Sequence, residues 1–258
     1  MENNYSITAL YSGSKGNSVL IESANAKILI DAGKSAKSLC LALSSIGKSI
    51  DEIDAIFITH EHRDHISALE ILLKHHKIPV HIVSASARKL LQKDIPAFDE
   101  CLCTHTPIFT VMVGDMVVKS FSTPHDSEYS VGYTIQIGEK TIGYATDIGY
   151  ITSEIKSALT GCESIVLECN HDEEMLMEGP YPYDLKLRIK SNRGHLSNTA
   201  CAEFASELCL VGTKNILLAH ISEENNDPTL AYDEVWTAIA DDCVNLKVAS
   251  QYEAVKLI

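Results

Sequence analysis

The most constraining feature of the sequence is the segment 59–65, "THEHRDH", which directly follows the mostly apolar run "IDAIFI". An apolar run of this length bounded by polar residues is typical of a buried strand, so the segment stands where that strand leaves the core. His60, His62, Asp64 and His65 offer imidazole and carboxylate groups from one short loop. The segment therefore predicts a metal-binding loop at the end of a buried strand and disfavours an ordinary polar turn.

Length and composition indicate the general class of protein. With 258 residues, 45% of them hydrophobic, the chain can bury a sizeable core, and we expect a single globular domain over residues 1–258. No run approaches the ~20 apolar residues that a membrane-spanning helix needs. The first residues, "MENNYSITAL", lack a basic stretch followed by an apolar one. We therefore expect no secretory signal, a cytoplasmic location and no membrane partner.

The formal net charge of −14 makes the general surface repel polyanions. It argues against broad electrostatic capture of duplex DNA. Bound divalent cations would nevertheless reverse the field within one cleft.

The eight cysteines are scattered, and no two of them have the C-x-x-C spacing of a zinc knuckle or a redox pair. We expect reduced, mostly buried thiols. Cys101 and Cys103 are the only close pair, and with His105 they offer a second possible metal site, although an ordinary surface strand is the favoured interpretation.

The first half of the chain combines strands with a few helices. Apolar runs predict strands over 6–12, 17–23, 26–33, 54–60 and 80–84, and helical spacing predicts helices over 35–47, 68–76 and 85–93. Gly47 is expected to end the first helix, and "GSKGNS" to form a tight hairpin turn between the first two strands. A phosphate contact by Lys15 or Asn17 in that turn is a secondary possibility.

The remainder begins with strands and then alternates strands with helices. Strands are expected over 109–114, 116–125, 130–138, 140–149, 164–169 and 215–220, with a short final strand, and helices over 152–160, 198–212 and 228–240. A polar helical stretch lies between residues 169 and 198. Two sheets with helices outside them, a β-rich half followed by a β/α half, predict the four-layered αββα class of α/β fold.

Several metal-binding residue types stand directly after predicted strands. His60, His125, Asp147 and His220 each occupy this position. Loops at one edge of the sheets can gather such residues into a common site.

Five segments in this order resemble the motifs of the metallo-β-lactamase superfamily: "LIDAG", "THEHRDH", "TPHD", "ATDIG" and "LLAHIS". They span Asp31 to His220. "GSKGNS", "ECNHD" and "GHLSN" narrow the resemblance to the YycJ/WalJ-like, exonuclease-like branch, which is more distantly similar to ribonuclease Z. The resemblance implies the four-layered αββα fold.

The resemblance also implies a site for two metal ions. His60, His62 and His125 would hold the first ion, Asp64, His65 and His220 the second, and Asp147 would bridge them. A hydroxide between the ions would be the nucleophile, and Asp64 beside it would orient it. Imidazole and carboxylate ligands suit zinc, manganese or iron. Asp31, the acidic residue of the first motif, is expected to hold the histidine loop in shape by hydrogen bonding.

Three histidines, His171, His195 and His220, are candidates for the last ligand position. His220 follows an apolar strand as the other ligands do, whereas His195 precedes a helix that Ser197 can cap. A helix N-terminus beside a histidine favours an anion site. The resemblance implies that His195 contacts the scissile phosphate, and we expect it to stabilise the transition state or protonate the leaving group; a helix-capping role is the alternative.

The segment "LECNHD" is harder to interpret. Glu168 is expected to fix a metal-binding histidine by hydrogen bonding. His171 and Asp172 border the substrate cleft on one interpretation and belong to an ordinary polar strand exit on the other.

The segment 179–195 combines aromatic residues with cations in an otherwise acidic chain. Such interleaving suits single-stranded nucleic acid, although a solvated helix face is an equally good interpretation. We expect Tyr183, Lys186 and Arg188 to bind substrate together with His195.

The function that these features predict is metal-dependent hydrolysis of a phosphodiester, with single-stranded or frayed DNA or RNA as the substrate. The main alternative is hydrolysis of a small molecule, such as a cyclic phosphodiester, a thioester or a lactone, on the same dinuclear site. A non-enzymatic scaffold protein is a third hypothesis, and the complete set of ligands argues against it.

Overall fold

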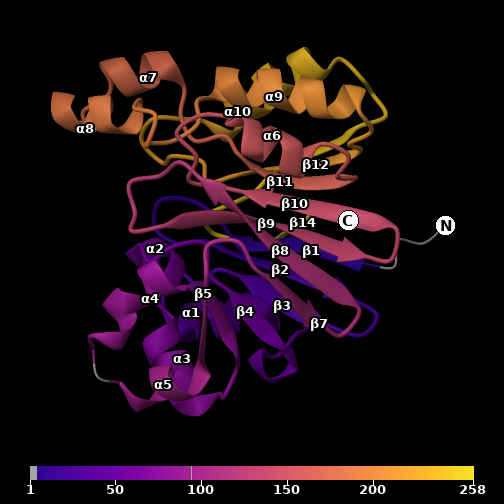
Figure 1. Cartoon of the computed structure of the whole chain (residues 1–258). Coiled ribbons are helices and arrows are strands. Elements are labelled where there is room, and N and C mark those ends of the chain that lie inside the picture. The colour runs from indigo at the N-terminus through magenta and orange to yellow at the C-terminus, as the bar shows by residue number, and fades with distance from the viewer. Residues whose placement is uncertain (1–4, 94) are drawn as a thin grey trace.

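The computed structural model of the chain describes residues 5–93 and 95–258. Two seven-stranded sheets face each other, in the orders β14-β1-β2-β3-β4-β5-β6 and β13-β12-β11-β10-β9-β8-β7. Helices α1, α3 and α5 cover the outer face of the first sheet, and α6, α9 and α10 cover the outer face of the second (Figure 1). The predicted four-layered αββα fold is confirmed.

The first sheet and its helices come almost entirely from the first 105 residues. Its strands are β1 Tyr5–Tyr11, β2 Ser18–Ser23, β3 Lys27–Ile30, β4 Ala55–Phe57, β5 Val80–Val83, β6 Leu102–His105 and, from the end of the chain, β14 Val255–Lys256. Its helices are α1 Ala36–Ser45, η1 Ile50–Glu52, α2 Arg63–Ile66, α3 Leu69–His75, α4 Ser84–Leu91 and α5 Pro96–Cys101.

The second sheet and its helices follow along the chain. The strands are β7 Thr110–Val113, β8 Met116–Thr123, β9 Ser130–Ile137, β10 Lys140–Ala145, β11 Ser164–Glu168, β12 Asn215–Ala219 and β13 Asn245–Val248. The helices are α6 Ser153–Leu159, α7 Glu173–Glu178, α8 Tyr183–Ile189, α9 Asn198–Leu210 and α10 Pro228–Ile239.

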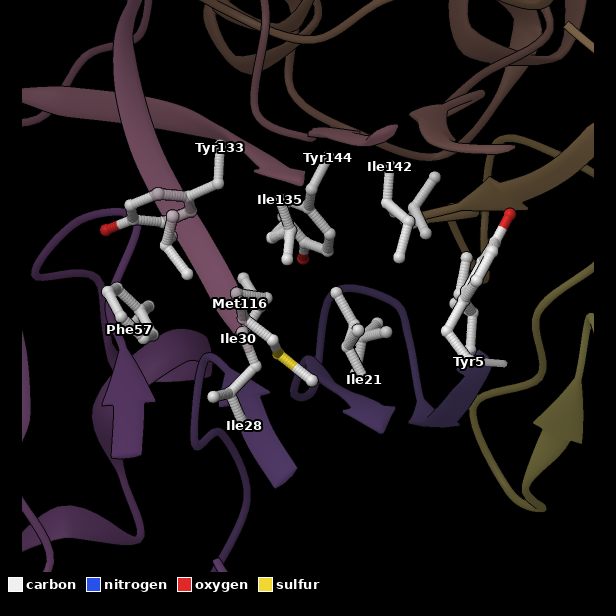
Figure 2. Close-up of a cluster of buried hydrophobic side chains, with 14 of the residues drawn as sticks. Tyr5, Ile21, Ile28, Ile30, Phe57, Met116, Tyr133, Ile135, Ile142 and Tyr144 are labelled. Carbon is white, nitrogen blue, oxygen red and sulfur yellow. The ribbon is translucent and has the colours of Figure 1, made fainter. Parts of the chain in front are cut away.

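A core of apolar side chains fills the space between the two sheets. Figure 2 shows Ile21, Ile28 and Phe57 from the first sheet opposite Tyr133 and Tyr144 from the second. In β3 the flanking residue Leu29 points to the outer helical layer, because successive side chains of a strand alternate between faces. Both faces of the sheet are therefore buried, which explains why its central strands read as continuous apolar runs.

The strand directions bring the predicted ligand loops to one edge of the molecule. Strands β3 to β6 run parallel to one another, as do β10 to β13, and β8 has the same direction as β10 because each pairs antiparallel with β9. The backbone N–H of Val131 donates to the carbonyl of Thr59 and joins the two sheets at that edge. Asp31, Asp147 and His220 have positive φ angles of 64°, 56° and 57°, so the chain turns sharply where these strands end.

The predicted helices and strands agree with the structure except in five places. The sequence interpretation did not anticipate η1, α2 within the histidine loop, α5, or the return of β14 to the first sheet, and the polar helical stretch forms two short helices, α7 and α8. Residues 1–4, on which part of the signal-peptide prediction rests, lie outside the described residues. In the described part of the chain, none of the helices combines the length and the apolar character required to cross a membrane.

Candidate metal centre

The seven residues expected to bind metal lie together, and we call them the ligand cluster. Among the described residues, three groups with ligand atoms within 4.8 Å of one another consist of these residues alone: His60, His62 and His125; Asp64, His65 and His220; and His60, His65 and Asp147. A fourth such group joins Asp147 and His220 to Glu168 and His195. The cluster draws on the ends of β4, β8, β10 and β12, as the position of these residues after strands predicted. The shared members His60 and His65 make it one continuous site.

Most of the cluster is buried, and its hydrogen bonding is incomplete. His60, His65 and Asp147 are at most 1% exposed. Within residues 5–93 and 95–258, His60 Nε2, His220 Nε2 and Asp147 Oδ2 are buried without a hydrogen-bond partner. Buried polar atoms are seldom left unpaired, because each costs about 1–3 kcal/mol. The imidazole nitrogens and carboxylate oxygens that converge here are ligand atoms that suit divalent cations.

Asp31 holds the histidine loop in place by hydrogen bonding. Its Oδ1 accepts a hydrogen bond from the backbone N–H of Thr59 at 2.8 Å, and its Oδ2 lies 2.7 Å from Nδ1 of His65. The contact orients the His65 ring so that Nε2 points into the cluster, 3.3 Å from Asp147 Oδ2. This is the arrangement by which carboxylates commonly fix metal-binding histidines.

The glycine-rich turn between β1 and β2 holds two parts of the cluster. The backbone N–H of Asn17 donates to the Asp64 carbonyl, and its side-chain Nδ2 lies 3.3 Å from Asp64 Oδ2. Ser12 Oγ accepts a hydrogen bond from the backbone N–H of His220. The simple hairpin turn predicted from the sequence is therefore also a support for the ligands. Gly33 is required beside it, since a Cβ there would lie 1.9 Å from the carbonyl oxygen of Asp64.

The remaining ligands are oriented from the second sheet. His125 Nδ1 donates to the Gly194 carbonyl at 3.1 Å, which leaves Nε2 for the cluster. The Asn170 amide lies 3.1 Å from His220 Nδ1 and donates to the His220 carbonyl. Sequence reasoning missed Asn170 as well as Ser12, and no spacing signal marks either.

Electrostatics divide the histidines of the cluster into two kinds. Burial opposes protonation of His65 and His220, but the carboxylates of Asp64 and Asp147 prevail, so the pKa of His65 is raised and that of His220 rises to about 9. Burial lowers the pKa of His60. Neighbouring imidazoles overcome the effect of burial on Asp147 and hold the pKa of that carboxyl well below its usual range. The site therefore stabilises positive charge, as a cation site must.

His195 lies beside the cluster and is held by Glu168. Its Nδ1 is 2.7 Å from Glu168 Oε1, while Oε2 of that buried carboxylate accepts hydrogen bonds from the N–H groups of Ile148 and Leu196. The His195 ring stacks on His220 with centroids 5.1 Å apart. Glu168 was expected to fix a metal-binding histidine, but it lies closer to His195 than to His220. Its Oε1 is 2.7 Å from His195 Nδ1 and 3.6 Å from His220 Nδ1.

The residues expected to bind substrate are dispersed. Arg188 pairs with Asp126 and lines a cavity of about 180 Å³ beside the cluster, together with Tyr181, Leu185 and His195. The side chain of Tyr183 is exposed and is not among the residues that line this cavity. Lys186 is 8% exposed, its amino group donates to the Met177 carbonyl, and it is not among the residues that line this cavity. Its contact with substrate stays a prediction that requires this hydrogen bond to break.

The structure also shows where the residues of the two less certain segments, 167–172 and 101–105, lie. Asp172 caps α7 by accepting a hydrogen bond from the Met175 N–H, whereas His171 is 1% exposed and lines a separate cavity next to His195. Among the described residues, the groups able to hold a metal include neither Cys103 nor His105. Segment Leu102–His105 is strand β6, the favoured interpretation of that stretch.

Comparison with known proteins gives a consistent picture. Residues 26–221 match the model of the beta-lactamase superfamily domain. The chain is 33% identical to the exodeoxyribonuclease YycJ of Bacillus anthracis over 87% of this chain and 85% of that protein. It is 34% identical to the exodeoxyribonuclease WalJ of Streptococcus pneumoniae over 88% and 85% of the two chains.

Solved structures support the fold assignment. The metallo-beta-lactamase fold protein YhfI of Bacillus subtilis superposes with a TM-score of 0.75 at 17% identity, covering 98% of this chain and 100% of that one. The short form of human tRNase Z superposes with a TM-score of 0.68 at 16% identity, covering 98% and 99%. At these identities the likeness concerns the fold.

Proposed function

We propose that this chain, which belongs to the metallo-β-lactamase superfamily and within it to the family of the YycJ and WalJ proteins, is a metal-dependent phosphodiesterase. We expect its activity to be exonuclease-like. It is a hydrolytic enzyme, and its proposed substrate is single-stranded or frayed DNA or RNA. The relatives named as exodeoxyribonucleases support the choice of a nucleic acid.

The observation that carries the proposal is the position of His195 next to the ligand cluster. Glu168 accepts from Nδ1 of His195, so Nε2 is the nitrogen available to a substrate. A histidine held in one orientation by a buried carboxylate, with its ring partly exposed beside a cation site, is arranged to give a proton to a leaving oxygen. Hydrolysis of a phosphodiester requires that proton, because the departing alkoxide is a poor leaving group.

We assign the ligands in two sets. His60, His62 and His125 would hold one divalent ion, Asp64, His65 and His220 a second, and Asp147 would lie between them. Two such ions would supply a nucleophile at neutral pH and Lewis acidity toward the phosphoryl oxygens. Zinc or manganese suits these ligands, and iron is compatible with them.

The other roles belong to residues of the chain. The Asp64 side chain is 24% exposed, whereas that of Asp147, the other carboxylate of the cluster, is 2% exposed. Burial opposes ionisation of Asp64, but His65 holds the pKa of that carboxyl well below its usual range. It is therefore ionised at neutral pH and can accept a hydrogen bond that orients the attacking water. We expect Arg188, which lines the cavity and pairs with Asp126, to exchange that carboxylate for a substrate phosphate.

The size of the cavity beside the cluster favours a strand end over a duplex. Its volume of about 180 Å³ is below the ~300–1,000 Å³ of typical small-molecule pockets. Tyr181, Leu185 and Arg188, from the segment containing α8, form part of its wall. A phosphate with parts of its neighbouring sugars fits such a space, whereas stacked base pairs do not. A second candidate function is hydrolysis of a cyclic phosphodiester, which would bring the same phosphate and its attached sugar atoms to this cavity.

An activity panel tests the proposal. The substrates are 5′-labelled single-stranded DNA, duplex DNA, RNA, a cyclic dinucleotide, bis-p-nitrophenyl phosphate and a thioester, each with Mn²⁺ or Zn²⁺ and with a chelator. We expect chelator-sensitive cleavage of phosphodiesters, fastest on single strands. Faster hydrolysis of the cyclic dinucleotide would favour the second candidate, and a dominant thioesterase rate would refute both.

A further inference from the structure

A second cavity adjoins His195 on the outer side of the second sheet. It has a volume of about 430 Å³ and lies among residues of α6, of α9 and of the segment 190–197. We call it the flanking cavity and define it by Tyr150, His171, His195, Ala200 and Phe204. His195 also lines the smaller cavity beside the ligand cluster, so one side chain borders both spaces.

We propose that the flanking cavity binds the nucleoside next to the scissile phosphate. This inference rests on the proposed function, because it assumes a nucleotide substrate at the ligand cluster. The volume lies within the range that encloses a small organic group.

The first support is the chemistry of the cavity walls. Tyr150 at the rim is 45% exposed, and Phe204, Leu196 and Ile151 supply apolar surface further along the wall. An exposed aromatic ring bordering a cavity is the usual platform on which a base stacks, whatever its identity.

The second support is His171, a buried polar group with an unused hydrogen-bonding atom. Its ring is 1% exposed, and its Nδ1 has no hydrogen-bond partner within residues 5–93 and 95–258. Burial lowers the pKa of His171 to about 4, so the imidazole is neutral at neutral pH. A neutral imidazole on a cavity wall suits a base edge or a sugar hydroxyl, which both donate and accept hydrogen bonds.

The charges around the cavity argue against a phosphate as its occupant. Its lining contains two ammonium groups, Lys156 and Lys190, and three carboxylates, Glu173, Glu203 and Glu207. Lys190 is paired with Glu173, and Lys156 with Glu207. Without an excess of positive charge the cavity favours a neutral group, and the phosphate is left to the ligand cluster.

Binding of a phosphorothioate thymidine oligonucleotide, which resists cleavage, tests the inference. Fluorescence anisotropy would compare the metal-loaded wild type with Ala200→Phe, which fills the cavity, and Tyr150→Ala, which removes the exposed ring. We expect each substitution to raise Kd by about tenfold, the order that one stacked base supplies. Because Tyr150 lies on the surface, its variant keeps the test valid if Ala200→Phe fails to fold.

Thr199→Phe is the matched control. Thr199 precedes Ala200 on α9 but is exposed and lines a different groove with Glu234. Its Kd should stay within about twofold of the wild-type value. Wild-type-like affinity of both cavity variants, or failure of the wild type to bind the oligonucleotide, overturns the inference. Hydrolysis of bis-p-nitrophenyl phosphate, which has no nucleoside, reports separately on the proposed function.

Discussion

Two groups of histidines in this molecule lie in different surroundings. The ligand cluster places its imidazoles among carboxylates, with His65 2.7 Å from Asp31 and 3.3 Å from Asp147. The other group is the pair His81 and His105, which lies at the edge of the first sheet between the rings of Phe57 and Phe109. We call it the aromatic histidine pair.

The surroundings of each group determine its protonation. Carboxylates raise the pKa of His220 to about 9, whereas burial, together with the neighbouring His105, lowers the pKa of His81 to about 4. His81 Nδ1 and His105 Nε2 are 2.9 Å apart and partner each other. In the part of the chain that the structure describes, His60 Nε2 and His220 Nε2 are buried and have no hydrogen-bond partner. Histidines become a cation site where carboxylates accompany them and their lone pairs converge without other partners.

We expect the largest loss of metal and activity when two imidazoles of the ligand cluster are removed. His60→Ala with His62→Ala deletes two imidazoles of the first proposed set, so metal content should fall by at least one ion per chain and hydrolysis by about 10³-fold or more. His81→Ala with His105→Ala is the control, and it should keep both metal and activity. Metal analysis of protein purified without added metal measures the difference. Full metal content in the first variant would refute the ligand assignment.

His195 provides the next largest effect and separates proton donation from metal binding. His195→Ala should retain metal, and turnover of nucleic acid should fall by about 10²–10⁴-fold, the range for a positioned general acid. The loss should be smaller for bis-p-nitrophenyl phosphate, whose leaving group barely needs a proton.

His220→Ala is the comparison variant for that experiment. It should lose metal and should lose activity on both substrates, because His220 belongs to the ligand cluster. Metal loss in His195→Ala together with metal retention in His220→Ala would mean that the two roles are exchanged.

The sequence predicted the sheets and the ligand cluster because both depend on local patterns. Apolar runs identified the central strands, and His60, Asp147 and His220 were recognisable because each directly follows such a run. The resemblance to the metallo-β-lactamase superfamily was confirmed by the family match over residues 26–221.

The parts that the sequence did not predict depend on contacts between distant segments. Asn170 and Ser12 meet His220 only after folding, and neither has a spacing that marks it. Lys186 and Arg188 stand two residues apart on α8 and looked equivalent, yet Lys186 turns to the Met177 carbonyl and Arg188 to Asp126. A basic run does not specify which cations face the substrate, since α8 presents different sides to different neighbours.

Asp31 should give an intermediate effect, because it acts on the cluster through His65. Asp31→Asn preserves the shape of the side chain and removes its charge, so metal affinity should fall by about 10–100-fold. Asp54→Asn is a matched control, since Asp54 accepts a hydrogen bond from the Lys27 N–H at the other end of the same sheet region. Competition with a chromogenic chelator measures the metal affinity of both variants. Unchanged affinity in Asp31→Asn would show that its contact with His65 does not contribute to the site.

The smallest effect concerns the aromatic histidine pair and the pH dependence of stability. His81 has a pKa of about 4 in the folded chain and about 6.5 when unfolded, so the unfolded state takes up the proton first as the pH falls. The stability that His81 contributes is therefore complete above pH 6.5 and is lost progressively toward pH 4. Because the ring is only partly buried, solvent screening reduces the effect to about 1 kcal/mol between pH 7 and pH 5.

His81→Phe removes this titration and retains a ring that can stack on Phe57. Urea unfolding of the metal-free wild type and variant at the two pH values measures the contribution of His81 together with its effect on its partner His105, because all other titrating groups are common to both proteins. The free energy of unfolding of the wild type should fall by about 1 kcal/mol more than that of the variant. An equal fall in both proteins would mean that His81 titrates normally. The contrast in protonation between the two histidine groups would then not extend to His81.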